Sequence, residues 1–179
     1  PPGAEGIVTT DLAAQVALAA DLAGLEGSGS PQPTGIASTA NVGAFTGATL
    51  AYAALLDAQA DVAGNNIRPI RGGYVTTPAV SALCMQRQRF SSTDTPLWTG
   101  NIWDGQMCGF PAMSSSQLTA ATMIFGAWEE LVMASWGTLE VEVNPYANFQ
   151  AGIVGVRAMY LMDVGVRRAQ AFSRATSIT

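Results

Sequence analysis

One pattern near the C-terminus constrains the fold more than any other feature of this sequence. Between residues 154 and 166, every second residue belongs to one predominantly apolar set. Alternation with a period of two is typical of a long β-strand with one buried face. A shorter alternation occupies residues 138–143, and residues 144–149 connect the two, so we expect a long antiparallel pair. The apolar face of the longer strand consists of Val154, Val156, Ala158, Tyr160, Met162, Val164 and Val166.

An alanine-rich stretch near the N-terminus predicts the helix that would cover this face. We expect the helix over residues 12–26, with Thr9, Thr10 and Asp11 available as N-caps. Alanine at so many positions would let another element approach closely. The apolar stripe that should face inward consists of Val16, Leu18, Leu22 and Leu25.

Shorter elements are expected through the rest of the chain. Residues 27–35, rich in glycine, serine and proline, end the first helix and are interpreted as a hinge or connector. A second helix is expected from about 47 to 63, and a third from Thr77–Pro78 to about 89. Residues 91–107 are interpreted as a loop. Further strands are expected at 74–76, 109–114, 122–125, 128–136 and 170–173, and the sum is an α+β fold.

The composition excludes several classes of chemistry. The 179 residues suit one compact domain, or one fold with two lobes. The sequence contains no His and no Lys, which excludes a Ser-His-Asp relay, a His-ligated metal, Schiff-base chemistry and a Walker lysine. Charged residues make up only 12%, against about 25% in ordinary soluble chains. Such a surface is expected where partner molecules cover much of the exterior.

The charges, the cysteines and the hydropathy further limit the partners and the cell compartment that can be expected. Residues 1–67 carry six acids and no base, so we do not expect a dedicated nucleic-acid binder. Cys84 and Cys108 could form one disulfide, but two free thiols in a reducing cytoplasm are the preferred interpretation. Gln15 and Asp21 interrupt the best apolar run, so no membrane span is expected, and no secretion signal is visible.

Three groups of residues were weighed as carriers of chemistry. Glu140 and Glu142 lie on one strand face and Glu129 and Glu130 are adjacent, and paired carboxylates can hydrolyse glycosides. A solvated or interfacial strand face is the simpler interpretation, and a carboxylate-dependent hydrolase stays a distant alternative. Residues 27–29 (GSG) follow a helix rather than a strand, so they are interpreted as a connector and not as a dinucleotide site.

Arginines and tryptophans are the remaining candidates, and both kinds of residue suit interfaces. The arginines could bridge to carboxylates of a neighbouring subunit or could be ordinary surface charge. Trp128 and Trp136 lie in strand patterns and are expected in the core, whereas Trp98 and Trp103 are open to either role. No catalytic, cofactor or metal site is expected. The arginines considered are Arg87, Arg89, Arg167 and Arg168.

Several short segments occur in an order that resembles a known family. The first helix ends at residues 21–29 and runs into PQPTGI at 31–36; GYVTTP follows at 73–78, and then Trp98. GFPAMS occupies 109–114, IFG occupies 124–126, and DVGV at 163–166 leads to AF at 171–172. This order resembles the major capsid proteins of tailed bacteriophages over nearly the whole chain.

The resemblance implies the Hong Kong ninety-seven-type fold, with a spine helix packed on long antiparallel strands and a mixed α/β second domain. It implies a P-domain at 1–36 and 127–166, and an A-domain at 37–126 and 167–179. The implied function is a structural subunit of a phage or prophage icosahedral capsid, assembled in the bacterial cytoplasm into pentamers and hexamers that enclose the genome. The partners would be copies of itself and possibly scaffolding, portal or decoration proteins, with no sequence-specific nucleic acid and no membrane.

The sequence also departs from the family pattern. The N-terminal arm and the extended E-loop of the family do not fit into the few residues before Thr9, so we expect a C-terminal portion of such a protein. Some relatives cross-link through a Lys–Asn isopeptide, and this sequence has no Lys to supply the amine. A shell protein of a bacterial nanocompartment with the same fold is the alternative.

Overall fold

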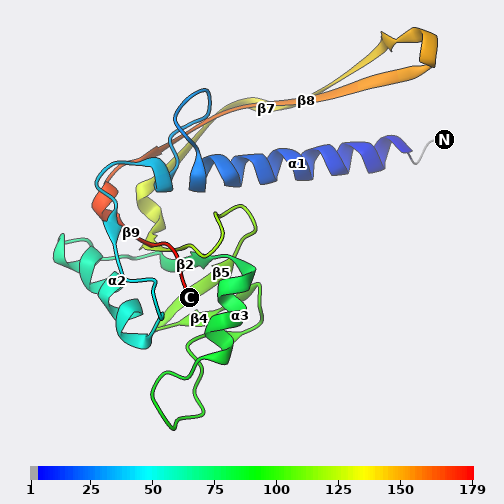
Figure 1. Cartoon of the computed structure of the whole chain (residues 1–179). Coiled ribbons are helices and arrows are strands. Elements are labelled where there is room, and N and C mark those ends of the chain that lie inside the picture. The colour runs from blue at the N-terminus through cyan, green and yellow to red at the C-terminus, as the bar shows by residue number, and fades with distance from the viewer. Residues whose placement is uncertain (1–3) are drawn as a thin grey trace.

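The computed structural model describes residues 4–179 and divides their strands between two sheets (Figure 1). A mixed seven-stranded sheet has the order β1-β9-β6-β2-β5-β4-β3, and β7 and β8 form a separate two-stranded ribbon. The α-helices are α1 (Ala4–Glu26), α2 (Tyr52–Gly64) and α3 (Pro78–Gln86). The strands are β1 (Gly43–Ala44), β2 (Gly72–Thr76), β3 (Thr99–Gly100), β4 (Asp104–Met107), β5 (Phe110–Ser114), β6 (Met123–Ala127), β7 (Leu131–Asn148), β8 (Ile153–Val166) and β9 (Phe172–Ala175).

The ribbon confirms the expected long antiparallel pair. The stretches expected at 128–136 and 138–143 join into the single strand β7, except that residues 128–130 form the 3-10 turn η2 (Trp128–Glu130). The register shifts where β7 passes Gly137, whose φ of 80° requires the left-handed region that glycine tolerates. A second shift falls between Asn144 and Asn148, where Pro145 cannot donate to the ladder. Both irregularities lie on β7.

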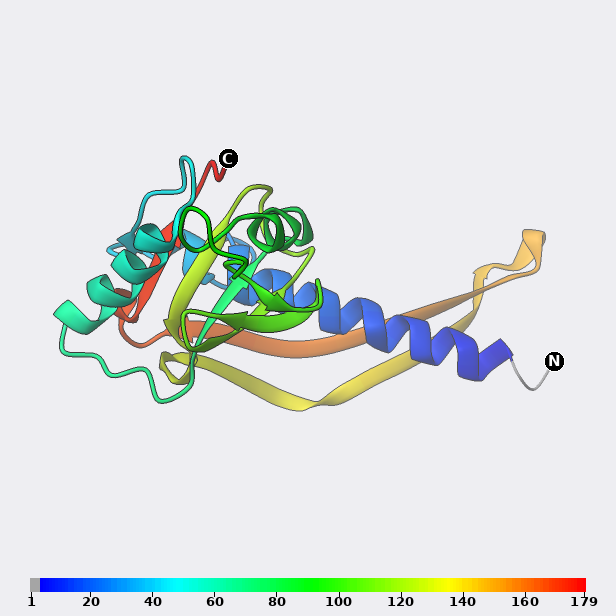
Figure 2. The same ribbon diagram turned by 90° about the horizontal axis from the view of Figure 1, so that it is seen from below.

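The expectation that one ribbon face is buried within the chain holds only towards the base of β8 and is wrong for the outer part of the ribbon. Val164 is 5% exposed at the base of β8, but Val154 and Val156 are 53% and 40% exposed, and Leu161 on the other face is 69% exposed. α1 lies along β8 on one side of the ribbon, as Figures 1 and 2 show. One helix can cover only part of one face of a two-stranded ribbon, so the rest stays in solvent.

Helix α1 is longer than expected, and two of its four predicted inward residues are exposed. It begins at Ala4, so Thr9 to Asp11 are helical rather than N-caps, and Thr10 Oγ1 donates to the Gly6 carbonyl at 2.8 Å. Leu18 and Leu22 are 41% and 38% exposed, which corrects this half of the predicted inward stripe. Val16 is half-buried and Leu25 is 8% exposed, as predicted. The less exposed positions recur at helical spacing: Leu12, Ala13, Val16, Ala20 and Ala23. The covered side of α1 therefore combines alanines with Leu12 and Val16, whereas Leu18 and Leu22 face solvent.

The expectation about membrane spans also needs a correction. By length and composition alone, the helical residues Gly6–Glu26 could cross a membrane. In the fold this helix packs along β8, and its C-terminal turn, with Leu25 at 8% exposure, joins the core of the globular lobe.

The segment 27–35 is a closed loop and not a hinge. The Gly35 N–H donates to the Gly27 carbonyl at 3.0 Å, and Gly29 N–H donates to the Pro33 carbonyl at 3.3 Å. A Cβ added to Gly27 would collide with the carbonyl oxygens of Pro33 and Ala23. The chain therefore leaves α1 through a fixed crossing that only glycine permits.

The core of the globular lobe lies between the seven-stranded sheet and helix α2. Strand β6 is buried at every position. The Tyr74 hydroxyl donates to the Leu55 carbonyl of α2 at 2.8 Å, and the rings of Tyr74 and Phe125 lie 4.6 Å apart. Neighbouring strands and a helix thus converge on one aromatic centre.

Long-range pairing shortens both predicted helices of this lobe. α2 starts at Tyr52 rather than near 47, because Thr49 has a φ of 53° and Leu50 N–H donates to the Thr179 carbonyl. α3 starts at Pro78 as expected but ends at Gln86, because residues 87–89 pair with residues 95–97. The expected loop 91–107 contains β3 and β4.

The glycine crossing leads to a stability prediction. Gly27→Ala should lower the free energy of unfolding by roughly 1–3 kcal/mol, because the new methyl group meets backbone carbonyls that cannot move aside. Gly24→Ala is the matched control one turn earlier. Its Cβ would meet nothing within 4 Å, and the higher helix propensity of alanine should add up to about 1 kcal/mol. Urea unfolding measures both, and equal stabilities of the two variants would contradict the crossing.

Candidate functional site: exposed apolar surfaces

Large apolar side chains extend into solvent along the whole ribbon. Trp136 is 59% exposed, Val143 61%, Tyr146 79% and Leu161 69%. Monomeric soluble proteins rarely leave so extended an apolar surface in water. We define the ribbon surface as the exposed apolar residues of β7 and β8: Val132, Met133, Trp136, Val141, Val143, Tyr146, Ile153, Val154, Val156, Met159, Tyr160 and Leu161.

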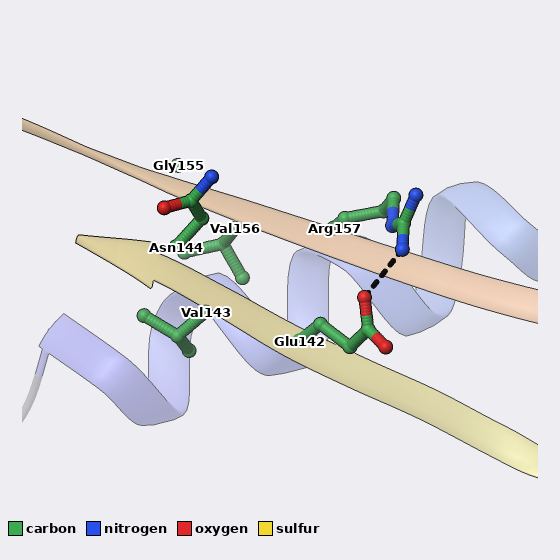
Figure 3. A pocket seen from close by; sticks show the side chains of 6 residues that line it. All are labelled: Glu142, Val143, Asn144, Gly155, Val156 and Arg157. Atoms are coloured by element: carbon green, nitrogen blue, oxygen red, sulfur yellow. Dashed lines mark hydrogen bonds and ion pairs between the residues drawn. The ribbon is translucent and has the colours of Figure 1, made fainter. Parts of the chain in front are cut away.

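The two glutamates weighed as catalytic groups lie on this ribbon. Glu142 forms an ion pair with Arg157, which lies directly opposite it on β8 (Figure 3). Glu140 lies opposite Met159. Both members of the ion pair are more than half exposed, so the pair contributes at most about 1 kcal/mol and holds the strand register. The hollow beside it is lined by residues of both strands (Figure 3).

The four tryptophans divide differently from the prediction. Trp98 is 1% exposed, and its indole N–H donates to the Asn101 carbonyl at 2.7 Å, so it is a core residue. Trp128 is half-buried and donates to the Gly73 carbonyl at 3.1 Å. Trp136, expected in the core, is exposed because the ribbon leaves the globular lobe. Trp103 is 62% exposed on the turn between β3 and β4.

Three of the four arginines considered as bridges to a neighbouring subunit interact with groups of their own chain. Arg87 donates to the Leu50 carbonyl at 2.6 Å, and the Arg89 guanidinium lies 5.0 Å from the centre of the Tyr52 ring. Arg167 lies 3.5 Å from a Glu130 carboxylate oxygen, without hydrogen-bond geometry. Arg168 is exposed. Arg87 and Arg89 therefore stabilise the globular lobe, and the other two stay on its surface.

The cysteines are both free thiols, as preferred from the sequence. Burial raises the pKa of Cys84 to about 12, although the positive charge of Arg87 acts to lower that pKa. Burial also raises the pKa of Cys108, and here Arg89 opposes the shift. Both thiols therefore stay protonated at neutral pH and are poor nucleophiles. Among the described residues, no three His, Cys, Asp or Glu side chains come together as a possible metal site.

The turn η2 joins the ribbon to the globular lobe, and sequence reasoning missed its role. The Glu129 carboxylate accepts the N–H groups of Ile70 and Arg71 at 2.8 and 3.2 Å. Arg167 N–H donates to the Glu130 carbonyl at 2.9 Å. Slight burial raises the pKa of Glu129, but the backbone donors and the Arg71 charge outweigh it and lower that pKa overall. The signal available in the sequence was an acid pair directly after a buried strand.

The fold and the motif order have matches among known proteins. Residues 3–176 match the phage capsid family. The chain belongs to the phage capsid family. It is 27% identical over 173 residues to the major capsid protein of Halomonas phage phiHAP-1, a match that covers 96% of this chain and 28% of that protein. This family member therefore spans under a third of that curated relative.

Solved capsid structures confirm the α+β capsid fold. The capsid of an empty GTA particle, computed with C5 symmetry, is 19% identical, has a TM-score of 0.72 and is matched over 98% of this chain and 65% of its own. A structure titled Gordonia phage Cozz is 14% identical, has a TM-score of 0.67 and is matched over 98% and 64%. These likenesses include the helix α1 and the ribbon, since nearly the whole chain is covered.

The Glu129 carboxylate should make stability depend on pH. Its folded-state pKa lies below the ordinary 4.5, so its contribution is complete above that value and is lost as pH falls through the lowered folded pKa. Glu129→Gln should therefore cost about 1 kcal/mol at pH 7, and the difference from wild type should shrink in acid.

Urea unfolding at several pH values measures this difference. Glu140→Gln is the matched control, because Glu140 is exposed and no described residue pairs with it. A difference for Glu129→Gln that stays constant from pH 7 to pH 3 would contradict the assigned role.

Proposed function

We propose that the chain is a structural subunit of a phage or prophage icosahedral capsid and acts without catalysis. The observation that carries the proposal is the ribbon surface, which leaves large apolar side chains in water on a chain of the phage capsid family. Association with another macromolecule would remove this apolar surface from water, and symmetric oligomers do so with copies of the same chain.

We assign the elements to two domains on this basis. The P-domain comprises 1–36 and 127–166, which hold α1 and the ribbon, and the A-domain comprises 37–126 and 167–179. The separation of the two sheets supports this division, because β9 follows the ribbon in sequence but lies in the seven-stranded sheet. The P-domain would carry the contacts between capsomers, and the A-domains would meet around the symmetry axes.

The partners follow from the same surfaces. Copies of the chain would form pentamers and hexamers, and a relative solved with C5 symmetry supports a cyclic arrangement. Scaffolding, portal and decoration proteins are further partners of such a shell. The net charge of −5 suits a coat that encloses DNA without sequence recognition. The site of action would be the virion, after assembly in the bacterial cytoplasm.

Substitution on the ribbon surface tests this function. Leu161→Asp should leave the unfolding temperature of the chain within about 2 °C of wild type, because Leu161 is 69% exposed and outside the core. In the complete capsid protein the same change should abolish particle formation, because a charge would have to be buried between copies.

Electron microscopy of the assembly reaction measures the outcome. Leu161→Met is the control, since it keeps the volume and the apolar character, and it should assemble. Particles that form normally with Leu161→Asp would contradict a role for the ribbon in assembly.

A further inference from the structure

Four of the eight basic residues belong to two short segments of the chain that flank η2. Arg68 and Arg71 belong to the connection between α2 and β2, and Arg167 and Arg168 follow β8. Both segments flank η2, because Trp128 N–H donates to the Arg71 carbonyl and Arg167 N–H donates to the Glu130 carbonyl. All four side chains are exposed. We call Arg68, Arg71, Arg167 and Arg168, with Ile70 between them, the arginine rim.

The rim combines positive charge with one exposed apolar side chain, Ile70, whose backbone is held in place. Ile70 is 85% exposed, yet the Glu129 carboxylate holds the N–H groups of Ile70 and Arg71. The two acids beside the rim, Glu129 and Glu130, are already engaged, and four arginines outnumber them. A side chain that is presented on a fixed backbone loses little entropy on binding. The rim is therefore suited to a surface that is both apolar and acidic.

Helix α1 carries such a surface on the side that faces away from the ribbon. Leu18 and Leu22 are exposed there, one turn apart. Asp11 and Asp21 share this side of the helix, and no described residue pairs with either carboxylate. We define the outer stripe of α1 as Ile7, Asp11, Leu18, Asp21 and Leu22.

The rim and most of the outer stripe lie apart within one molecule. Asp21 borders the globular lobe beside Trp128, but Ile7 and Asp11 lie further along α1, away from the lobe. Figure 2 shows the connection after α2 at one end of the molecule, whereas α1 extends toward the opposite end. α1 spans about 34 Å at 1.5 Å per residue, so most of its stripe is far from the rim. Two complementary surfaces that lie apart on one chain generate rings when copies associate head to tail.

We propose that the arginine rim of one copy binds the outer stripe of α1 in a second copy. Ile70 would pack between Leu18 and Leu22, while the arginines face Asp11 and Asp21. This contact rests on the proposed function, because it requires that copies of the chain associate. Nucleic acid fits the rim less well, because the chain has a net charge of −5 and a phosphate backbone offers Ile70 no apolar partner.

Charge reversal on the 179-residue chain tests the pairing. The rim variant carries Arg68→Glu and Arg168→Glu, and the stripe variant carries Asp11→Arg and Asp21→Arg. All four positions are exposed, so both variants should fold like the wild type by circular dichroism. In sedimentation velocity at low salt, each variant alone should self-associate at least tenfold more weakly than the wild type. An equimolar mixture should restore association, because every contact between unlike copies is again complementary.

The controls separate this contact from the function on which it rests. Ser91→Glu with Thr95→Glu adds negative charge at exposed positions in the connection after α3, away from both surfaces, and should associate like the wild type. If either reversed variant associates like the wild type, or if the mixture shows no recovery, the contact between rim and stripe is refuted. The proposal that copies of the chain associate is not affected by either result. A wild-type chain that stays monomeric at every concentration overturns the contact and counts against the proposed function as well. A rim variant that loses binding to double-stranded DNA but keeps self-association assigns the rim to phosphate and overturns the proposal.

Discussion

The contact between α1 and β8 sets how much of the ribbon can be buried by the chain itself. Alanine at positions such as Ala20 and Ala23 brings the helix close to the strands, but one helix covers part of one face. An isolated two-stranded ribbon is at best marginally stable in water. The ribbon is therefore stabilised partly by its contact with α1. The rest of its stability depends on the molecule that covers its exposed apolar side chains. The proposed capsid function rests on this limit.

Sequence patterns predicted the elements that depend on local periodicity. The alternation in 154–166 gave the long strand, and Pro78 marked the start of α3. The predictions failed where the answer depended on distant partners. The alternation in the strand predicted that one face is covered by apolar atoms. It could not indicate whether those atoms come from the same chain or from another molecule. Leu18 and Leu22 were expected to face inward with Val16 and Leu25, yet only Val16 and Leu25 are covered.

The junction between the lobes could not be predicted for the same reason. Glu129 receives its hydrogen bonds from residues nearly sixty positions earlier in the chain, and no local pattern connects them. The segment 27–35 looked flexible by composition, but two of its glycines are present because backbone atoms cross there. The chemistry that was excluded, by contrast, needed no structure. A chain without His or Lys lacks the groups that a Ser-His-Asp relay, a His-ligated metal and Schiff-base chemistry require.

The central claim is that the ribbon surface is covered by other copies of the protein in its working state. Hydroxyl-radical footprinting of the free chain and of the assembled particle, read at individual residues by mass spectrometry, tests it most directly. The account predicts that oxidation of Trp136 and Leu161 falls steeply on assembly, while Trp98, already buried in the free chain, is unchanged. Equal oxidation of Trp136 and Leu161 in the two states would contradict it.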